Sequence, residues 1–273
     1  MRSEKVTLDK TTFGKTTFGK TAVLQKLSPW VVLVVLVFIW YAVTKQRIWS
    51  SYLLPPPQRV AKTFAELALN GWLARNTLAS LQRMLIGFFI SVALAVPLGF
   101  VFAAYPKVYG YCKGVLELLR NTPPLAFIPL LILWCGIGEL SKLVLIVLVA
   151  FFPILINTVE GVAHADQKLV EAGQVFGFSR GRVFREIIFP GALPNIVTGM
   201  RIGMGYSWRA IIGAEMIASS SGLGYMILDG QQLSQTDVVI CGIIVIALLG
   251  ELGELLLSRL TRPFLAWREN VRI

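Results

Sequence analysis

The sequence predicts an all-α polytopic membrane protein with six transmembrane helices and with both termini in the cytoplasm. Of its 273 residues, 55% are hydrophobic and 15% are charged, whereas soluble domains carry about 25% charged residues. Six apolar stretches follow one another along the chain, each close to the roughly 20 residues that a helix needs to cross a bilayer. The basic residues gather between these stretches, as the charges that orient a membrane protein do.

The six stretches set the expected boundaries of the membrane-spanning helices. They are residues 29–44, 84–105, 115–135, 143–158, 196–218 and 238–257. In lipid the backbone must satisfy its own hydrogen bonds, so helices are expected throughout. Pro123, Pro124 and Pro129 interrupt the third stretch. Residues 1–28 are polar and contain a short tandem repeat, so we expect a mobile cytoplasmic tail followed by a membrane domain over residues 29–273.

Charge predicts the orientation of the helices. With a cytoplasmic N-terminus, the inward-facing segments hold 18 of the 26 basic residues. The exception is the segment 45–83, which is long, and long segments obey the positive-inside rule weakly. This segment contains a proline run at 55–57 and an amphipathic stretch at 60–69, which we expect to form an interfacial helix on the outer face.

The composition also argues against several classes of protein. The net charge is +11, but no basic stripe interleaved with aromatic residues indicates nucleic-acid binding. A single histidine, His164, and three scattered cysteines predict no metal site. A membrane enzyme is disfavoured because no HExxH or GxSxG pattern occurs. A six-helix secondary transporter remains an alternative, although neither internal repeats nor a charged relay is visible.

The longest internal polar segment, residues 159–195, is expected to face the cytoplasm. Residues 167–178 form an amphipathic pattern, and Gly177 is expected to break that helix. Ser179 can cap a second helix over residues 180–188, which should end before Pro190. A helix–turn–helix beside the membrane suits the docking of a cytosolic partner; the alternative is a simple connector.

The spacing within this segment resembles the EAA loop of binding-protein-dependent ABC importer permeases. That pattern is E-A-A, three residues, G, nine residues, I, one residue, L-P. The matching positions here are Glu171, Ala172, Gly173, Gly177, Ile187, Phe189 and Pro190. Gly173 replaces the third small residue of the pattern and Phe189 replaces a leucine, and both changes are mild.

Further motifs resemble the taurine, aliphatic sulfonate and nitrate branch of these permeases. They are Leu53-Leu54-Pro55-Pro56-Pro57, Ser80-Leu81-Gln82-Arg83, Pro123-Pro124-Leu125-Ala126, Trp134-Cys135-Gly136-Ile137-Gly138, Thr198-Gly199-Met200-Arg201 and Ala214-Glu215-Met216. The resemblance implies the type I ABC importer permease fold in the bacterial inner membrane. It also implies a small anionic or zwitterionic solute, with taurine or an alkanesulfonate favoured and with nitrate, bicarbonate or a neutral heterocycle as alternatives.

The resemblance further implies a set of partners. These are a second copy of the chain, two cytosolic ATPase subunits, a periplasmic or lipid-anchored substrate-binding protein and membrane lipid. The chain itself has no G-x-x-x-x-G-K-[ST] phosphate loop, so it is expected to be a transport subunit rather than an enzyme. ATP and magnesium would be bound by the partner ATPase subunits, and no cofactor is expected in this chain.

Two groups of residues are expected to carry the function. The ATPase-coupling group is Glu171, Ala172, Gly173, Gly177 and Pro190. The candidate translocation pathway is lined by Asn121, Asn157, Trp208, Arg209 and Glu215. For the coupling group, an amphipathic helix and two glycines would allow close approach to the ATPase.

Arg209 lies near the middle of the fifth expected span, where an unpaired charge is strongly unfavourable. It could attract an anionic substrate through its planar guanidinium. The alternative is an ion pair with Glu251 or Glu254, which share one helix face. The Gly199-x-x-x-Gly203 pattern permits close helix contact, either within the chain or at the axis of a dimer.

Overall fold

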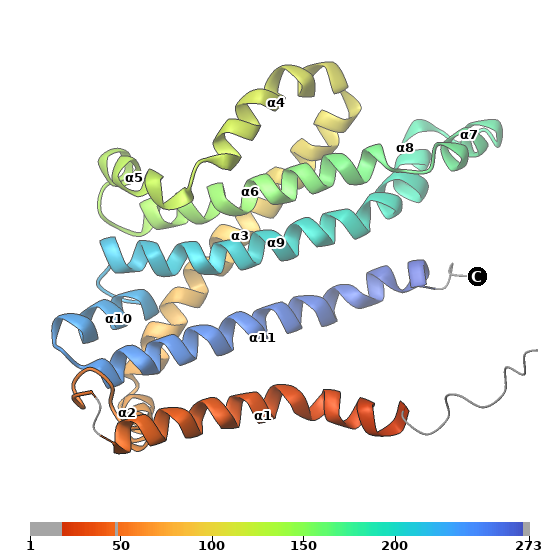
Figure 1. Cartoon of the computed structure of the whole chain (residues 1–273). Helices are drawn as coiled ribbons and strands as arrows, with labels where there is room; N and C mark the ends of the chain where they lie inside the picture. Colours follow the sequence, from red (N-terminus) through yellow and green to blue (C-terminus); the bar gives the residue numbers. More distant parts are fainter. Residues whose placement is uncertain (1–17, 47–48, 270–273) are drawn as a thin grey trace, which may run out of the picture. The chain divides into compact units, whose positions relative to one another are not determined.

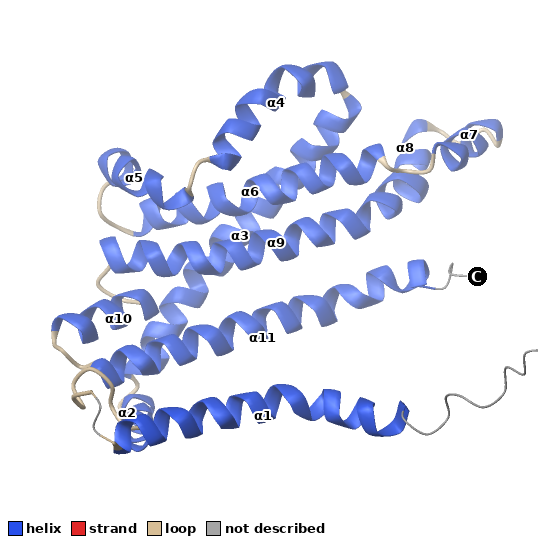
Figure 2. Ribbon diagram, viewed as in Figure 1, coloured by secondary structure: helices blue, strands red, loops and turns tan. Residues whose placement is uncertain are grey.

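The computed structural model describes residues 18–46 and 49–269. In these residues every regular element is a helix; loops connect the helices, and the described residues contain no strands (Figure 2). The chain divides into two compact units, residues 1–61 and residues 62–273. Helix α2 (Pro57–Leu69) crosses the boundary between them, and its position confirms the amphipathic helix expected at 60–69.

The first unit contains one long helix, α1 (Phe18–Lys45). Its residues 31–39 expose apolar side chains, as a lipid-facing helix does. After α1 the chain turns, and the indole Nε1 of Trp40 donates a hydrogen bond of 3.1 Å to the carbonyl of Pro55. Helix α1 thus begins inside the expected polar tail, because good helix formers such as Leu24 precede the apolar stretch; the division of the chain at residue 28 stays a prediction. Residues 1–17 lie outside the described part of the chain.

The second unit is built around α3 (Trp72–Ala104), α6 (Glu139–Ala163) and α9 (Phe189–Ala218). Helix α6 lies along both α3 and α9. Helix α11 (Thr236–Glu269) packs against α9 and against the short α10 (Leu223–Gln232), as Figure 1 shows. The core therefore lies where α3, α6 and α9 meet.

Glycines allow α6 and α9 to approach closely. A Cβ atom built on Gly199 would lie 2.8 Å from the carbonyl oxygen of Pro153, and one on Gly203 would lie 3.2 Å from that of Ala150. A side chain at Gly199 would therefore force the helices apart. Packing of apolar helices in lipid depends on such small residues, so the Gly199-x-x-x-Gly203 pattern serves contact within the chain.

The third expected span is not one straight helix. Helix α4 (Pro106–Asn121) is followed by the 3₁₀ turn η1 (Pro124–Phe127) and by α5 (Ile128–Cys135), and the chain bends by 92° between them. Pro123 and Pro124 cause the break, because proline lacks an N–H donor and disfavours helical backbone in the residue before it.

Three described helices are long and apolar enough to cross a membrane: α3, α6 and α11. The bent α4–α5 segment would make a fourth if it counts as one span, and α1 contributes a shorter apolar stretch from Val31 to Lys45. Helix α9, which contains the fifth expected span, is not among them; it carries Arg201, Arg209 and Glu215. The count of six spans therefore remains a prediction.

Candidate functional site

The loop between α6 and α9 forms two short helices, each capped at its start by a side chain, and the cap at Ser179 is the one that the sequence predicted. Helix α7 (Gln167–Val175) begins after Asp166, whose carboxylate accepts a hydrogen bond of 2.9 Å from the Lys168 amide. Helix α8 (Arg180–Val183) begins after Ser179, whose hydroxyl oxygen accepts one of 3.3 Å from the Arg182 amide. These side chains satisfy amide groups that helix starts leave unpaired.

Gly177 ends α7 through its backbone conformation. Its φ is +73°, in the left-handed region that glycine adopts without a steric penalty. A Cβ atom there would meet nothing within 4 Å. Within this chain Gly177 is therefore required for the turn, and its role in a close fit to an ATPase subunit stays a prediction.

Gly173 holds the loop together. It is buried, and a Cβ atom built on it would lie 2.9 Å from Cδ1 of Ile187. The small residue near the start of the EAA-like pattern and the isoleucine near its end are thus in contact. Gly173 permits close approach inside the chain, where it fixes α7 against the segment that leads into α9.

The second helix of the loop does not end before Pro190, contrary to expectation. Helix α8 passes into a π-helical turn, η2 (Phe184–Ile188), which passes directly into α9. Pro190 occupies the first turn of α9. Proline is tolerated in a first turn because it needs no amide partner there, and the wider π-helical turn bridges the change. Helix α8, the η2 turn and α9 therefore form one continuous helical element.

The tip of α7 exposes apolar side chains. Val175 is 86% exposed, Phe176 is 79% exposed and Leu169 is 56% exposed. We call these three residues the α7 tip. Glu171 is also exposed on this helix. In Figure 1 α7 and α8 project at the end of the second unit where α11 also ends, and α5 and α10 lie at the opposite end.

Glu215 is enclosed at that opposite end and lines neither of the two cavities described below. Its side chain has no exposed surface. The carboxylate accepts hydrogen bonds from Ser80 Oγ at 2.7 Å, from Arg83 Nη1 at 2.8 Å and from the Gly224 amide at 3.0 Å. A buried charge with this many donors is paired and satisfied, so we do not include Glu215 in the proposed pathway.

Arg83 extends the same cluster to α6. Its Nε and Nη2 donate hydrogen bonds of 2.5 and 2.9 Å to the two carboxylate oxygens of Glu139, and Nη2 also reaches the Ser221 hydroxyl at 2.7 Å. Lys142 binds Glu139 at 2.9 Å. Arg83, Glu139, Lys142 and Glu215 form what we call the end cluster, which ties together α3, α6 and the α9–α10 connection. In the sequence, the only indication of the end cluster was the charge of Arg83 within a helix otherwise rich in apolar residues.

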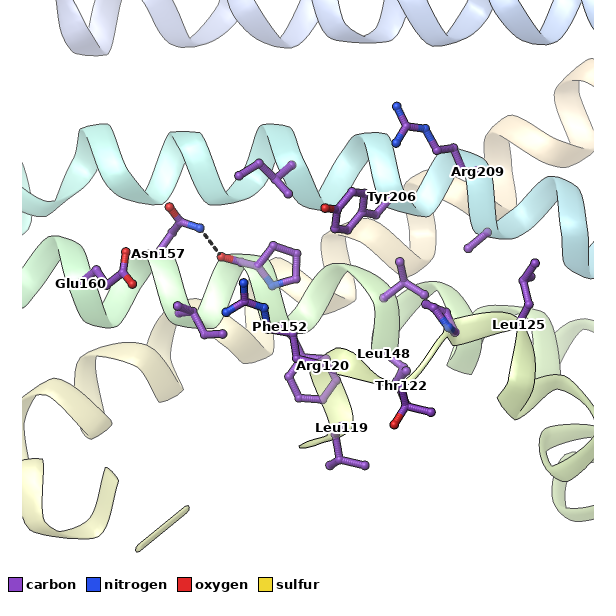
Figure 3. A pocket seen from close by; sticks show the side chains of 16 residues that line it. Leu119, Arg120, Thr122, Leu125, Leu148, Phe152, Asn157, Glu160, Tyr206 and Arg209 are labelled. Carbon is purple, nitrogen blue, oxygen red and sulfur yellow. Dashed lines mark hydrogen bonds between the residues drawn. The ribbon is translucent and has the colours of Figure 1, made fainter. Parts of the chain in front are cut away.

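A cavity of about 490 Å³ lies among α4, η1, α6 and α9 (Figure 3). Its walls are mostly apolar, with a few polar groups. The polar and charged side chains that line it are Arg120, Thr122, Asn157, Glu160, Tyr206 and Arg209. The Asn157 amide group is fixed by a hydrogen bond of 2.8 Å from Nδ2 to the Pro153 carbonyl. An apolar cavity with a few polar groups is the usual form of a small-molecule site.

A second cavity, of about 650 Å³, lies among α3, α9 and α11. Its charged lining residues are Arg201, Arg209, Glu251 and Glu254. Arg209 thus borders both cavities, and Figure 3 shows its guanidinium directed away from Tyr206. Among the described residues the guanidinium makes no ion pair with either glutamate, so the expected alternative of a salt bridge to α11 is not present in this structure.

The other expected pathway residues divide between the cavities and the surrounding structure. Asn157 and Arg209 line the first cavity, and Trp208 and Arg209 line the second. The indole of Trp208 is buried and donates a hydrogen bond of 3.0 Å to the Ile246 carbonyl, which also packs α9 against α11. Asn121 is exposed and lines neither cavity. In the described residues no group of three or more histidines, cysteines and acidic residues is placed to hold a metal.

Sequence and structure comparisons agree with this arrangement. Residues 95–263 match the family described as binding-protein-dependent transport system inner membrane component. The chain is 38% identical to the taurine transport system permease protein TauC of Escherichia coli (strain K12), over 88% of this chain and 89% of that protein. It is 39% identical to the putative aliphatic sulfonates transport permease protein SsuC of Bacillus subtilis (strain 168), over 86% of each chain.

Among solved structures, a chain from the inward-facing MetNI methionine ABC transporter shares the fold. The TM-score is 0.63 at 18% identity, over 72% of this chain and 98% of that one. At this identity the likeness concerns the fold alone, and it agrees with the packing of the second unit. The match over residues 95–263, together with the two sequence relatives, shows that this chain belongs to the family of binding-protein-dependent transport system inner membrane components, the permease subunits of ABC importers.

Proposed function

We propose that this permease subunit translocates a small sulfonate, taurine or another alkanesulfonate, across the bacterial inner membrane. The observation that carries the proposal is the first cavity, in which two arginines, Arg120 and Arg209, line largely apolar walls. A guanidinium binds a multi-oxygen anion through paired N–H donors. The two relatives described above are named for taurine and for aliphatic sulfonates. Nitrate, bicarbonate and a neutral heterocycle are the alternatives.

The assembly that we propose contains two copies of this chain, two cytosolic ATPase subunits and an external substrate-binding protein. Each chain would cross the membrane six times with both termini in the cytoplasm. The α7 tip supports ATPase docking, since exposed side chains as large as Val175 and Phe176 at the end of a projecting helix suit a partner's socket. ATP and magnesium would act in the ATPase subunits.

The continuous helix from α8 to α9 supplies a route for coupling. A displacement of the α7 tip would be passed through the contact of Gly173 with Ile187 to η2 and so to α9. Helix α9 carries Tyr206 and Arg209, which line the first cavity. Nucleotide-driven motion of the loop would therefore change the walls of that cavity, because packed helices transmit shifts rather than absorb them.

Transport of radiolabelled sulfonates tests the substrate. The complete assembly, reconstituted in liposomes with its binding protein, should import taurine or an alkanesulfonate only when ATP is supplied to the ATPase side. Nitrate and bicarbonate serve as competitors. Import of nitrate but of no sulfonate would overturn the proposed substrate, and ATP-independent import would favour a secondary transporter.

Copurification tests the docking role of the α7 tip. Replacing Val175 and Phe176 by serine should remove ATPase subunits from the purified complex, while the permease still inserts in the membrane. The matched control is Ile217→Ser, which changes a residue that is 62% exposed near the other end of α9. Equal loss of ATPase from both variants, or none from either, would contradict the role of the tip.

A further inference from the structure

The π-helical turn η2, which joins α8 to α9, lies where two features weaken the helix. The Phe189 amide donates its hydrogen bond to the Phe184 carbonyl, five residues earlier, which is the wide spacing of a π-helix. Pro190 and Pro194 follow in the first two turns of α9, and each lacks the amide hydrogen that would continue the helical ladder. Helices bend at π-helical turns and at prolines, so the continuous element from α8 to α9 can bend here.

Tight packing fixes α9 immediately after η2. A Cβ atom built on Gly161 of α6 would lie 2.9 Å from the Ala192 carbonyl oxygen and 2.9 Å from Cβ of Asn195. Ala192 is fully buried. Helix α3 is fixed to α6 in the same way, since a Cβ atom built on Gly99 would lie 2.6 Å from Cβ of Thr158. Bending is therefore confined to η2 and the start of α9, and α3, α6 and α9 form one packed block beyond it.

Three phenylalanine rings connect the two ends of η2 to this block. Phe184 begins η2, Phe189 directly follows it, and Phe100 lies on α3. The Phe100 ring lies edge-to-face against Phe184, with centroids 5.1 Å apart, and is stacked on Phe189 at 5.9 Å. The centroids of Phe184 and Phe189 are 6.4 Å apart. These distances are typical of favourable aromatic pairs, and we call the three rings the aromatic brace.

The brace is not part of the fully buried core. Phe184 is 41% exposed and Phe189 is 39% exposed, and Phe100 is half-buried. Phe189 also occupies the position at which the EAA pattern has a leucine. A leucine would supply apolar volume but no ring to stack on Phe100. The rings thus supply contacts across η2 that apolar burial alone would not require.

We propose that Phe100, Phe184 and Phe189 are positioning residues that stiffen η2, so that a displacement of the α7 tip moves the packed block of α3, α6 and α9 instead of bending the helix at η2. The inference rests on the proposed coupling of the loop to ATPase subunits, and it adds α3 to the route. Without the brace, the loop would move alone, and ATP would be hydrolysed with less transport.

The test measures solute uptake per ATP hydrolysed by the complete assembly in liposomes, with its binding protein. The solute is radiolabelled taurine, or nitrate if the wild type imports only nitrate. Phe100→Leu should retain bound ATPase subunits and ATP hydrolysis but lower the uptake per ATP about tenfold, the size expected if its two ring contacts together contribute about 1.4 kcal/mol. Phe100→Tyr keeps the ring and should retain the wild-type ratio.

Phe89→Leu is the matched control. Phe89 lies on the same helix as Phe100 and makes an edge-to-face contact with Phe88 at 5.6 Å, away from η2. Its loss should leave the uptake per ATP unchanged. If Phe100→Leu does not insert in the membrane, Phe189→Leu serves instead, because it introduces the residue of the EAA pattern; it should lower the uptake per ATP in the same direction.

Hydrogen exchange of the amides of residues 185–189 provides a readout that does not depend on transport. In the complete assembly, Phe100→Leu should raise their exchange about tenfold, through the same loss of ring contacts. Exchange in α6 should stay as in the wild type. Phe89→Leu should change neither segment.

The outcomes separate this inference from the proposed function. A wild-type complex without ATP-dependent import would contradict the proposed function, and the exchange measurement would still test the brace. If the wild type imports its solute with ATP, an uptake per ATP in Phe100→Leu or Phe189→Leu equal to that of Phe89→Leu overturns the role in coupling. Unchanged exchange at residues 185–189 overturns the brace itself, even where transport falls.

Discussion

Replacing Arg83 by glutamine should destabilise the protein more than the loss of any exposed ion pair. The change removes the positive partner of Glu215, whose side chain has no exposed surface. Glu215 would keep the Ser80 hydroxyl and the Gly224 amide as donors, but it would have no counter-charge. Removing one member of a buried pair costs about 3–5 kcal/mol, because the remaining charge stays desolvated.

Loss of the pair with Glu139, the second partner of Arg83, contributes less to the destabilisation. The side chain of Glu139 is 59% exposed, so water can replace the lost guanidinium, and Lys142 still binds it. Exposed pairs are worth about 0–1 kcal/mol. The expected loss in the free energy of unfolding is therefore about 3–5 kcal/mol, almost all of it from Glu215.

Denaturant unfolding in detergent micelles measures the effect. Lys113→Gln is the control, because it breaks the pair of Lys113 with Glu117, whose side chains are 57% and 53% exposed; it should cost about 0.3–0.5 kcal/mol. Adding Glu215→Gln to Arg83→Gln should recover much of the stability, since the buried charge is gone. A loss below about 1 kcal/mol for Arg83→Gln, or no recovery in the double variant, would refute this reasoning.

Three further changes test the loop and the pathway. Gly173→Leu should destabilise the loop by about 1–3 kcal/mol through overpacking, measured by protease sensitivity, and Ile187→Ala in the same chain should relieve it. Gly177→Ala should weaken the α7–α8 turn by about 1–2 kcal/mol because Gly177 has a positive φ, and hydrogen exchange of the loop amides measures the effect. The control is Gly181→Ala, which should change the exchange little because its methyl group enters open space at a residue with ordinary helical backbone. Arg209→Gln should reduce sulfonate uptake while changing the unfolding free energy by about 0.5 kcal/mol or less, and a large loss of stability would instead indicate a structural ion pair.

The end cluster also explains how a short polar connection is held at the end of the second unit opposite α7. Ser80 donates to Glu215 and accepts a hydrogen bond of 2.8 Å from the Leu223 amide, and Asn76 accepts one of 2.8 Å from the Gly222 amide. The start of α10 is thus pinned to α3. The Glu215 carboxylate also accepts a hydrogen bond from the Gly224 amide. Its negative charge therefore lies at the N-terminus of α10, where the helix dipole favours it.

The sequence by itself determined the helical class, the membrane setting, the family and much of the loop between α6 and α9. These follow from local signals: long apolar stretches, the prolines at 123 and 124, the cap at Ser179 and a glycine at 177 where a helix must end. Each signal acts within a few residues, so it can be recognised without the fold. The spacing from Glu171 to Pro190, which resembles the EAA loop, can likewise be recognised in the sequence without the fold.

Only the tertiary structure decided which charges pair and which border a cavity. Arg83 and Glu215 lie 132 residues apart, and nothing local to either indicates the other. The sequence favoured Glu215 as a pathway residue and did not single out Arg120 or Glu160, because an intramembrane charge is costly unless it is paired, and pairing depends on how distant helices pack. The fold encloses Glu215 with its partner and leaves the other two bordering one cavity.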